Sequence, residues 1–283
     1  MWLPHPCYDS KAHYEIGRIH LPVAPFCDIQ CNYCVHGINS TENRPGLTAA
    51  IVSPKKALRR LDWAIRSDPR IRIAAIAGPG EPLANEATFE TFALVNQRFP
   101  ELSKCLSTNG LTLLDKLPRL EEVGVKYLTV TLNAVDPTIS EAIYAHVSWK
   151  RNFYHGVQAG QILLERQLEG IYQASQRGFM VKVNTVLIPG INSDHLMEVA
   201  QTIKTVGACL MNIMPLIPVG RFSGLRSPTT EELKKSRAEC EPIIKQWYLC
   251  KQCRADAVGV PGEEIGTKVQ QELCLRACAT CSH

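Results

Sequence analysis

Twelve cysteines stand out among the 283 residues, because thiolates bind metals and several of these cysteines lie close together along the chain. Two groups share a spacing of three and then two intervening residues, and a CxxC pair lies between them: Cys27, Cys31 and Cys34; Cys250 and Cys253; Cys274, Cys278 and Cys281. Three thiolates at this spacing can hold three corners of a cubane iron–sulfur cluster and leave the fourth iron open. The first group therefore predicts a cluster whose open iron binds a reactant.

A zinc site is the alternative for both groups. The first could form a zinc knot with a distant fourth ligand such as His36. The last group could hold an extra cluster or zinc, or form a thiol-rich end without metal. The first group directly follows a predicted strand, where a β/α protein places its active-site loop, and this position favours the cluster.

The composition is that of a globular protein, with 45% apolar and 20% charged residues. The net charge of +4 is small and scattered, which by itself argues neither for nor against a nucleic acid, and no apolar run is long enough to span a bilayer. We expect neither a nucleic acid nor a membrane among the partners. The opening residues, MWLPHPCYDSKAHYE, lack the pattern of a secretory signal. We therefore expect a cytoplasmic protein whose reduced thiols are available to metal.

Short β-rich runs alternate with helical patterns along the first 220 residues. Strands are predicted at 16–24, 71–77, 104–108, 127–134, 180–188 and 208–216, with helices at 53–67, 85–99, 111–124, 158–178 and 194–207. Six such units predict an α/β fold with a parallel sheet, and they are too few for a closed eight-stranded barrel. We expect a partial (β/α)6 barrel over 1–220. A helix over 231–247 and a cysteine-rich tail would complete an extension over 221–283.

The first cysteine group, with Tyr33 before its last cysteine, resembles the radical S-adenosylmethionine (SAM) superfamily. The resemblance implies that SAM chelates the open iron of a 4Fe–4S cluster and is cleaved to a 5′-deoxyadenosyl radical. By position it also implies SAM-binding roles at the ends of the predicted strands, for Tyr33, Gly78, Gly80, Glu81, Thr131, Asn133, Asn184 and Ile188. It assigns no side chain a catalytic role.

A closer resemblance, to the NifB family, covers roughly residues 4–261. It rests on segments that include HPCYDSKAHYEIGRIHLPVAP, ENRPG, AIAGPGEPLAN, CLSTNGL, NTVLIPGIN and CRADAVG. The resemblance implies an enzyme that builds the carbide-centred iron–sulfur precursor of the nitrogenase cofactor. Two four-iron clusters would lie beside the SAM site, and a methyl group from SAM would supply the carbon that joins them into an eight-iron cluster.

The family match also implies ligands for these one or two additional clusters. Cys250 and Cys253 match the ligands of one substrate cluster, with Cys7 as its third, and Cys105 matches a ligand of the other. Cys209 and Cys240 are interpreted as core or surface thiols. The lone histidines His5, His13 and His20 are interpreted as packing or surface residues.

The sequence departs from the family at the Cys105 cluster. Asn39 stands about where the family has a further cysteine, and the chain begins too close to HPC to supply an upstream histidine. His36 or the group Cys274, Cys278 and Cys281 could replace these ligands; otherwise the site is weakened or lost. We expect no fused acidic carrier domain.

Two other functions compete with a NifB-like enzyme. One is a radical SAM enzyme that acts on a peptide or small molecule, with auxiliary clusters on the C-terminal cysteines. The other is a non-catalytic cluster or zinc carrier. For the leading hypothesis we expect three kinds of partner: an iron–sulfur cluster donor, a reductant such as ferredoxin, and a downstream cofactor carrier or scaffold protein.

Overall fold

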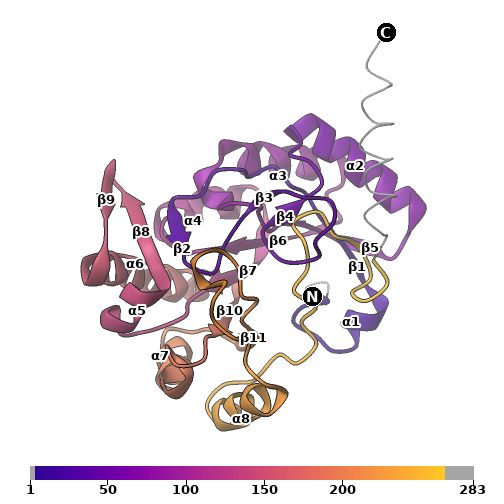
Figure 1. Ribbon diagram of the computed structural model, residues 1–283. Helices are drawn as coiled ribbons and strands as arrows, with labels where there is room; N and C mark the ends of the chain where they lie inside the picture. The colour runs from indigo at the N-terminus through magenta and orange to yellow at the C-terminus, as the bar shows by residue number, and fades with distance from the viewer. Residues whose placement is uncertain (1–3, 265–283) are drawn as a thin grey trace.

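Seven strands form one curled sheet in the computed structural model, which describes residues 4–264 (Figure 1). Their order is β11 (Leu210–Pro215), β10 (Met180–Leu187), β7 (Val125–Thr131), β6 (Ser103–Thr108), β5 (Ile71–Ile76), β1 (Gly17–His20) and β12 (Val258–Gly259). The first six in this order are parallel, and β12 adds antiparallel to β1 at the edge. The predicted partial (β/α)6 barrel is confirmed.

Helices cover the outer face of this sheet. They are α2 (Pro54–Ser67), α3 (Glu86–Arg98), α4 (Leu113–Glu122), α6 (Gly156–Gln176), α7 (Leu196–Thr205) and α8 (Thr230–Cys240). Helix α2 begins as its sequence predicts, because Ser53 accepts a hydrogen bond from the Lys56 N–H and Pro54 occupies the first turn. None of the helices between residues 4 and 264 is both long and apolar enough to cross a bilayer.

The predicted helix over 231–247 is wrong in its second half. Helix α8 ends at Cys240, and Pro242 follows. Proline has no amide hydrogen and its ring clashes with the preceding turn, so Pro242 disfavours continuation of the helix past Cys240. Beyond it the chain runs beside β11, where Trp247 N donates to Met211 O at 2.7 Å.

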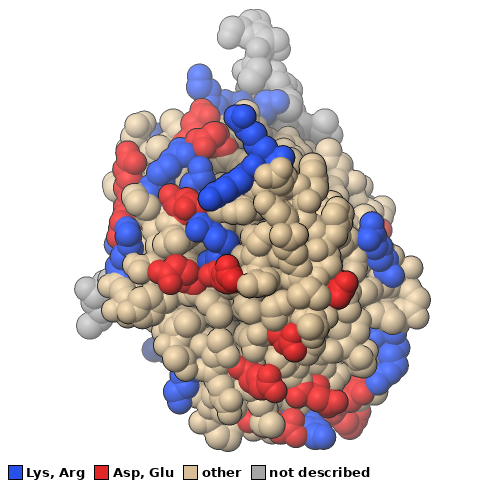
Figure 2. All heavy atoms as spheres, turned by 90° about the vertical axis from the view of Figure 1, so that its left-hand side faces the viewer, with Lys and Arg blue, Asp and Glu red and all other residues tan. Residues whose placement is uncertain are grey.

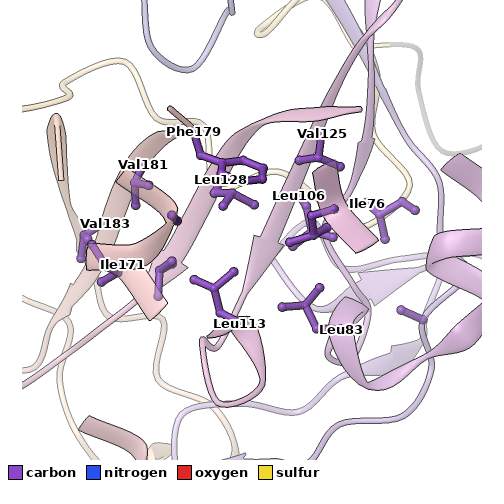
Figure 3. Packing of buried hydrophobic residues seen from close by; sticks show 14 of the residues in the cluster. Ile76, Leu83, Leu106, Leu113, Val125, Leu128, Ile171, Phe179, Val181 and Val183 are labelled. Atoms are coloured by element: carbon purple, nitrogen blue, oxygen red, sulfur yellow. The ribbon is translucent and has the colours of Figure 1, made fainter. Parts of the chain in front are cut away.

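Residues alternate between the two faces of the strands, which separates the core from the cavity described below. Leu106, Leu128, Val181 and Val183 point outward and pack beneath the helices, as Figure 3 shows. Their neighbours Cys105, Ser107, Thr129, Lys182 and Asn184 line the concave side. A strand with one apolar and one polar face carries such an alternation. The outer face therefore stabilises the barrel, and the inner face is free for chemistry.

Several short elements were not predicted. Strands β2 (Ile29–Cys31), β8 (Tyr144–Trp149) and β9 (Asn152–Tyr154) form a second sheet, and β3 (Gly37–Ile38) pairs with β4 (Leu47–Thr48). Helices α1 (Ala12–Glu15) and α5 (Pro137–Ile143) complete the additions. The β2–β8 pairing matters most here, because it fixes Cys31 opposite Tyr144.

The chain after residue 220 joins the same sheet through β12 and packs α8 beside α7. The division at 220/221 stays a prediction. On the face shown in Figure 2, basic and acidic side chains are interspersed. This pattern agrees with the small net charge of the sequence.

Candidate functional site

One cavity of about 310 Å³ opens on the concave side of the sheet. Seven cysteines from four separate parts of the chain line it: Cys7, Cys27, Cys31, Cys34, Cys105, Cys250 and Cys253. Cys209 and Cys240 lie outside this lining, the first exposed and the second buried. Cys274, Cys278 and Cys281 lie outside the described residues. The fold thus brings together every described cysteine that was predicted to be a ligand.

The loop with Cys27, Cys31 and Cys34 is held in a fixed shape. Cys34 N donates to Cys31 O at 3.0 Å, and the Gln30 amide donates to the carbonyl oxygens of Cys31 and Cys34 at 2.9 and 3.1 Å. Burial raises the pKa of all three thiols, and the neighbouring thiols raise that of Cys31 further. Buried thiols become thiolates when a metal supplies positive charge, so these side chains fit an iron–sulfur cluster.

The spread of these ligands also favours a cluster over a single ion. Within residues 4–264, no three His, Cys, Asp or Glu side chains converge closely enough to hold one metal ion. Zinc needs sulfur ligands at about 2.3 Å from one point, whereas a cubane presents its irons over several ångströms. His36, with Nδ1 3.8 Å from Cys34 Sγ, is nearest to completing the zinc alternative.

The motif after β5 packs directly against the chain that enters this loop. Gly80 N donates to Ala24 O at 2.7 Å, and Glu81 N donates to Phe26 O at 2.8 Å. A Cβ atom at Gly80 would lie 2.4 Å from Phe26 O, so the position requires glycine. Gly80 and Glu81 line the cavity, whereas Gly78 does not.

Gly80→Ala is expected to destabilise the protein by roughly 1–3 kcal/mol, because the added methyl group overlaps backbone that cannot move aside. The free energy of unfolding in guanidinium chloride measures this. Gly224→Ala is the matched control, since a Cβ atom there meets nothing within 4 Å. Equal stability of the two variants would contradict the close approach.

Glu81 organises the end of the neighbouring strand rather than projecting freely. Its carboxylate accepts hydrogen bonds from Leu83 N, Thr108 Oγ1 and Asn109 N at 2.6 to 2.9 Å. Burial, and then the nearby Asp28 carboxylate, raise its pKa to about 8. Its side chain therefore ties the motif after β5 to the end of β6.

The remaining predicted SAM-site residues divide into two sets. Tyr33, Thr131 and Asn184 line the cavity. Asn133 and Ile188 are fully buried and are not among the lining residues. The Asn133 amide donates to the hydroxyl oxygens of Tyr33 and Tyr144 at 2.7 and 3.0 Å, so it positions Tyr33. Ile188 packs in the apolar cluster beside the loop.

Basic side chains on the opposite wall were not predicted from the sequence. Arg18 and Lys182 are 1% and 5% exposed, and His5 and His20 lie beside them. Burial, and then the charge of Arg18, lower the pKa of His20 to about 4. The signal in the sequence was Arg18, a cation within the short predicted first strand. A cation at a buried strand position needs a specific partner, so it marks a possible functional residue.

Comparison with known proteins identifies the family. Residues 21–203 match the radical SAM superfamily. The FeMo cofactor biosynthesis protein NifB of Methanocaldococcus infernus is 44% identical over 92% of this chain and 86% of its own length. The chain belongs to the NifB family. It is a radical SAM enzyme.

Other relatives and solved structures agree. NifB of Methanocaldococcus jannaschii is 44% identical over 90% of the chain, and that of Bradyrhizobium diazoefficiens is 43% identical over 96%. The chain spans 86% of the first of these relatives and 56% of the second. A radical SAM methyltransferase from Sphaerobacter thermophilus shares the fold, with a TM-score of 0.56, 18% identity, and coverage of 82% of this chain and 64% of the other.

The CRADAVG segment that resembles NifB proteins clamps the C-terminal part of the chain onto the β3–β4 segment, beside which Figure 1 draws it. Arg254 donates to the carbonyl oxygens of Asn39 and Glu42 and to the Asp256 carboxylate. Asp256 also accepts from Ala49 N at 2.6 Å. The segment thus fixes the chain next to Cys253 against residues 39–49.

Asp256→Asn is expected to cost roughly 3–5 kcal/mol, because it leaves the Arg254 charge buried without its counter-charge. Burial alone would raise the pKa of Asp256, but Arg254 and Ala49 lower it below its ordinary value. The stabilisation is therefore present above about pH 4 and is lost as the pH falls further.

Unfolding in denaturant measures this loss of stability. The control is the surface variant Asp62→Asn, whose partner Arg66 is 73% exposed, and it should change stability by less than about 1 kcal/mol. A similar loss in both variants would contradict the clamp.

Asn39, which stands about where the resemblance implies a further cysteine, does not line the cavity. Its Oδ1 accepts from the backbone N–H groups of Thr41 and Glu42, at 2.8 and 3.0 Å, and its Nδ2 donates to the Glu42 carboxylate. The side chain closes a turn, as asparagine commonly does. His36 lines the cavity near Cys34 and is the closer candidate for a replacement ligand.

Proposed function

We propose that this enzyme builds an eight-iron precursor of the nitrogenase cofactor by joining two four-iron clusters around a carbon atom from SAM. The observation that carries the proposal is the single cavity lined by seven cysteines from four parts of the chain. One cluster needs only three or four of them, so the cavity has ligands for more than one. Relatives named for FeMo cofactor biosynthesis support the same reaction.

In this proposal Cys27, Cys31 and Cys34 hold the SAM-binding 4Fe–4S cluster. When bound, that cluster supplies the electron that cleaves SAM. Gly80, Glu81, Thr131 and Asn184 form the SAM pocket from the ends of β5, β7 and β10, and Tyr33 is oriented by Asn133. The roles of Gly78 and Ile188, which lie outside the cavity lining, stay predictions.

The substrate clusters are assigned to the opposite wall. Cys7, Cys250 and Cys253 hold one of them; all three line the cavity, and Cys7 adds to burial in raising the pKa of the Cys253 thiol. Cys105 binds the other; His36, which lies beside Cys34, stays a predicted additional ligand. Whether Cys274, Cys278 and Cys281 add ligands stays a prediction.

The role also requires partners. A cluster donor loads the cavity, a reductant such as ferredoxin supplies electrons, and a downstream carrier or scaffold protein accepts the product. Membership of the NifB family implies that the cofactor precursor is passed on to the maturation of nitrogenase.

The test is anaerobic reconstitution of the full chain with iron and sulfide, followed by addition of SAM and dithionite. We expect about 11–12 irons per chain, counted as three four-iron clusters. We also expect both S-adenosylhomocysteine, from methyl transfer, and 5′-deoxyadenosine without any organic substrate. If 5′-deoxyadenosine forms only with a peptide or small molecule, the alternative radical SAM function holds. If SAM is not cleaved at all, the chain is a carrier.

A further inference from the structure

The guanidinium group of Arg18 is buried between strand β1 and the segment that carries the CxxC pair. The side chain is 1% exposed. Nη1 donates to Gly259 O at 2.7 Å, and Nη2 donates both to Cys253 Sγ at 2.9 Å and to Glu264 Oε1 at 2.7 Å. One buried cation thus contacts a proposed cluster ligand directly.

The charges around Arg18 are arranged to keep it ionised. Burial alone would lower its pKa, but Cys253, Cys7 and Glu264 raise it above its ordinary value. Glu264 is 29% exposed, so the carboxylate lies at the rim while the two cysteines lie along the cavity wall. A buried guanidinium beside two proposed thiolate ligands would offset part of the negative charge of a bound cluster.

Two buried N–H groups on this wall have no acceptor among residues 4–264. One is Nε of Arg18, and the other is Nε2 of His5. Nδ1 of His5 accepts from the Cys7 N–H at 3.0 Å, so the neutral ring carries its hydrogen on Nε2. Both residues line the cavity. Buried donors are normally paired, so an acceptor is expected here when the cavity is loaded.

We propose that Arg18 is a positioning residue for the substrate cluster on Cys250 and Cys253. Its Nη2 fixes the Cys253 sulfur, and its Nε–H donates a hydrogen bond to a sulfur of that cluster, with His5 as a second donor. The inference rests on the proposed function and adds to it a residue that controls the charge and reduction potential of this cluster. Hydrogen bonds to sulfur and nearby charge are the protein's means of setting such potentials.

Three variants test this in the reconstituted full chain. Arg18→Met removes the charge and the donors, Arg18→Lys keeps the charge, and Glu264→Gln removes only the ion pair at the rim. The readout is a redox titration followed by electron paramagnetic resonance. The signal of this cluster is the one that Cys250→Ala with Cys253→Ala eliminates.

Arg18→Met should lower the midpoint potential of that signal, since reduction adds negative charge that no cation then offsets. Arg18→Lys should lie nearer the parent protein. Glu264→Gln should leave the potential unchanged or raise it, because it removes a negative charge. If Arg18 only holds Cys253 in place and does not act on the charge of the cluster, the midpoint potential of Arg18→Met should equal that of the parent protein, and that result would overturn the proposal.

Loss of the cluster in Arg18→Met is also informative. In that case Arg18→Lys carries the test: a cluster that binds there with a potential near that of the parent protein supports the proposal, and loss of the cluster there as well overturns it. If the Cys250→Ala, Cys253→Ala variant keeps every signal of the parent, no cluster binds at this pair. In that case the proposed function fails, independently of the behaviour of Arg18.

Discussion

SAM cleavage is expected to fall below detection when Cys27, Cys31 and Cys34 are all replaced by alanine, while the fold survives. Without three thiolates the cluster that reduces SAM has no ligands in this loop. The main core beneath the helices does not include them, although Cys27 and Cys31 pack against the smaller apolar cluster beside the loop. The measurements are the amount of 5′-deoxyadenosine formed under dithionite and the thermal unfolding temperature.

Cys209→Ala is the matched control for this variant. Cys209 is an exposed thiol outside the cavity lining, so its removal should leave SAM cleavage within about twofold of the parent protein. Formation of 5′-deoxyadenosine by the triple variant would refute the assignment of these three cysteines. Loss of the folded state in the triple variant alone would show that the loop stabilises the barrel.

Cys250→Ala together with Cys253→Ala is expected to remove about four irons per chain and to abolish methyl transfer. A CxxC turn places two thiolates at adjacent positions of one cluster, so losing both should empty that site. SAM cleavage should persist, because Cys27, Cys31 and Cys34 belong to a separate segment that β2 and β8 hold in place. Iron analysis and quantification of S-adenosylhomocysteine provide the two readouts.

The control for this pair changes the same turn but keeps both sulfurs. Lys251 lies between the two cysteines, is exposed and is not part of the cavity lining, so Lys251→Ala should keep the turn. Its iron content and methyl transfer should match the parent protein. Unchanged iron content in the double cysteine variant would refute the assignment of Cys250 and Cys253 as cluster ligands.

Local patterns were enough to predict the six β/α units. Strand β10 shows why. Its apolar Val181 and Val183 alternate with Lys182 and Asn184, and residues with this period of two lie on one face only in a strand. Ser53 and Pro54 likewise mark the start of α2 within the chain itself. These signals are short-ranged, so they can be read without knowing the fold. Pro242 is an equally local signal for the end of α8 near Cys240.

The predicted ligand sets rested on the same kind of local information. The spacing of Cys27, Cys31 and Cys34, and the CxxC of Cys250 and Cys253, restrict which thiolates can share a cluster. The segments that resemble NifB proteins extended this to Cys7 and Cys105. The family was therefore recognisable from the sequence alone, and the comparisons confirm it.

Only the tertiary structure decided which of these groups meet. The β2–β8 pairing joins Cys31 to Tyr144, and Arg18 contacts Cys253 across 235 positions of the chain. Such long-range contacts depend on the curl of the whole sheet, which no local pattern encodes. The same applies to Asn39, whose side chain closes a turn instead of facing the cavity. The sequence determined which residues can bind iron, and the closing of the sheet determined that they surround one cavity with buried cations on its wall.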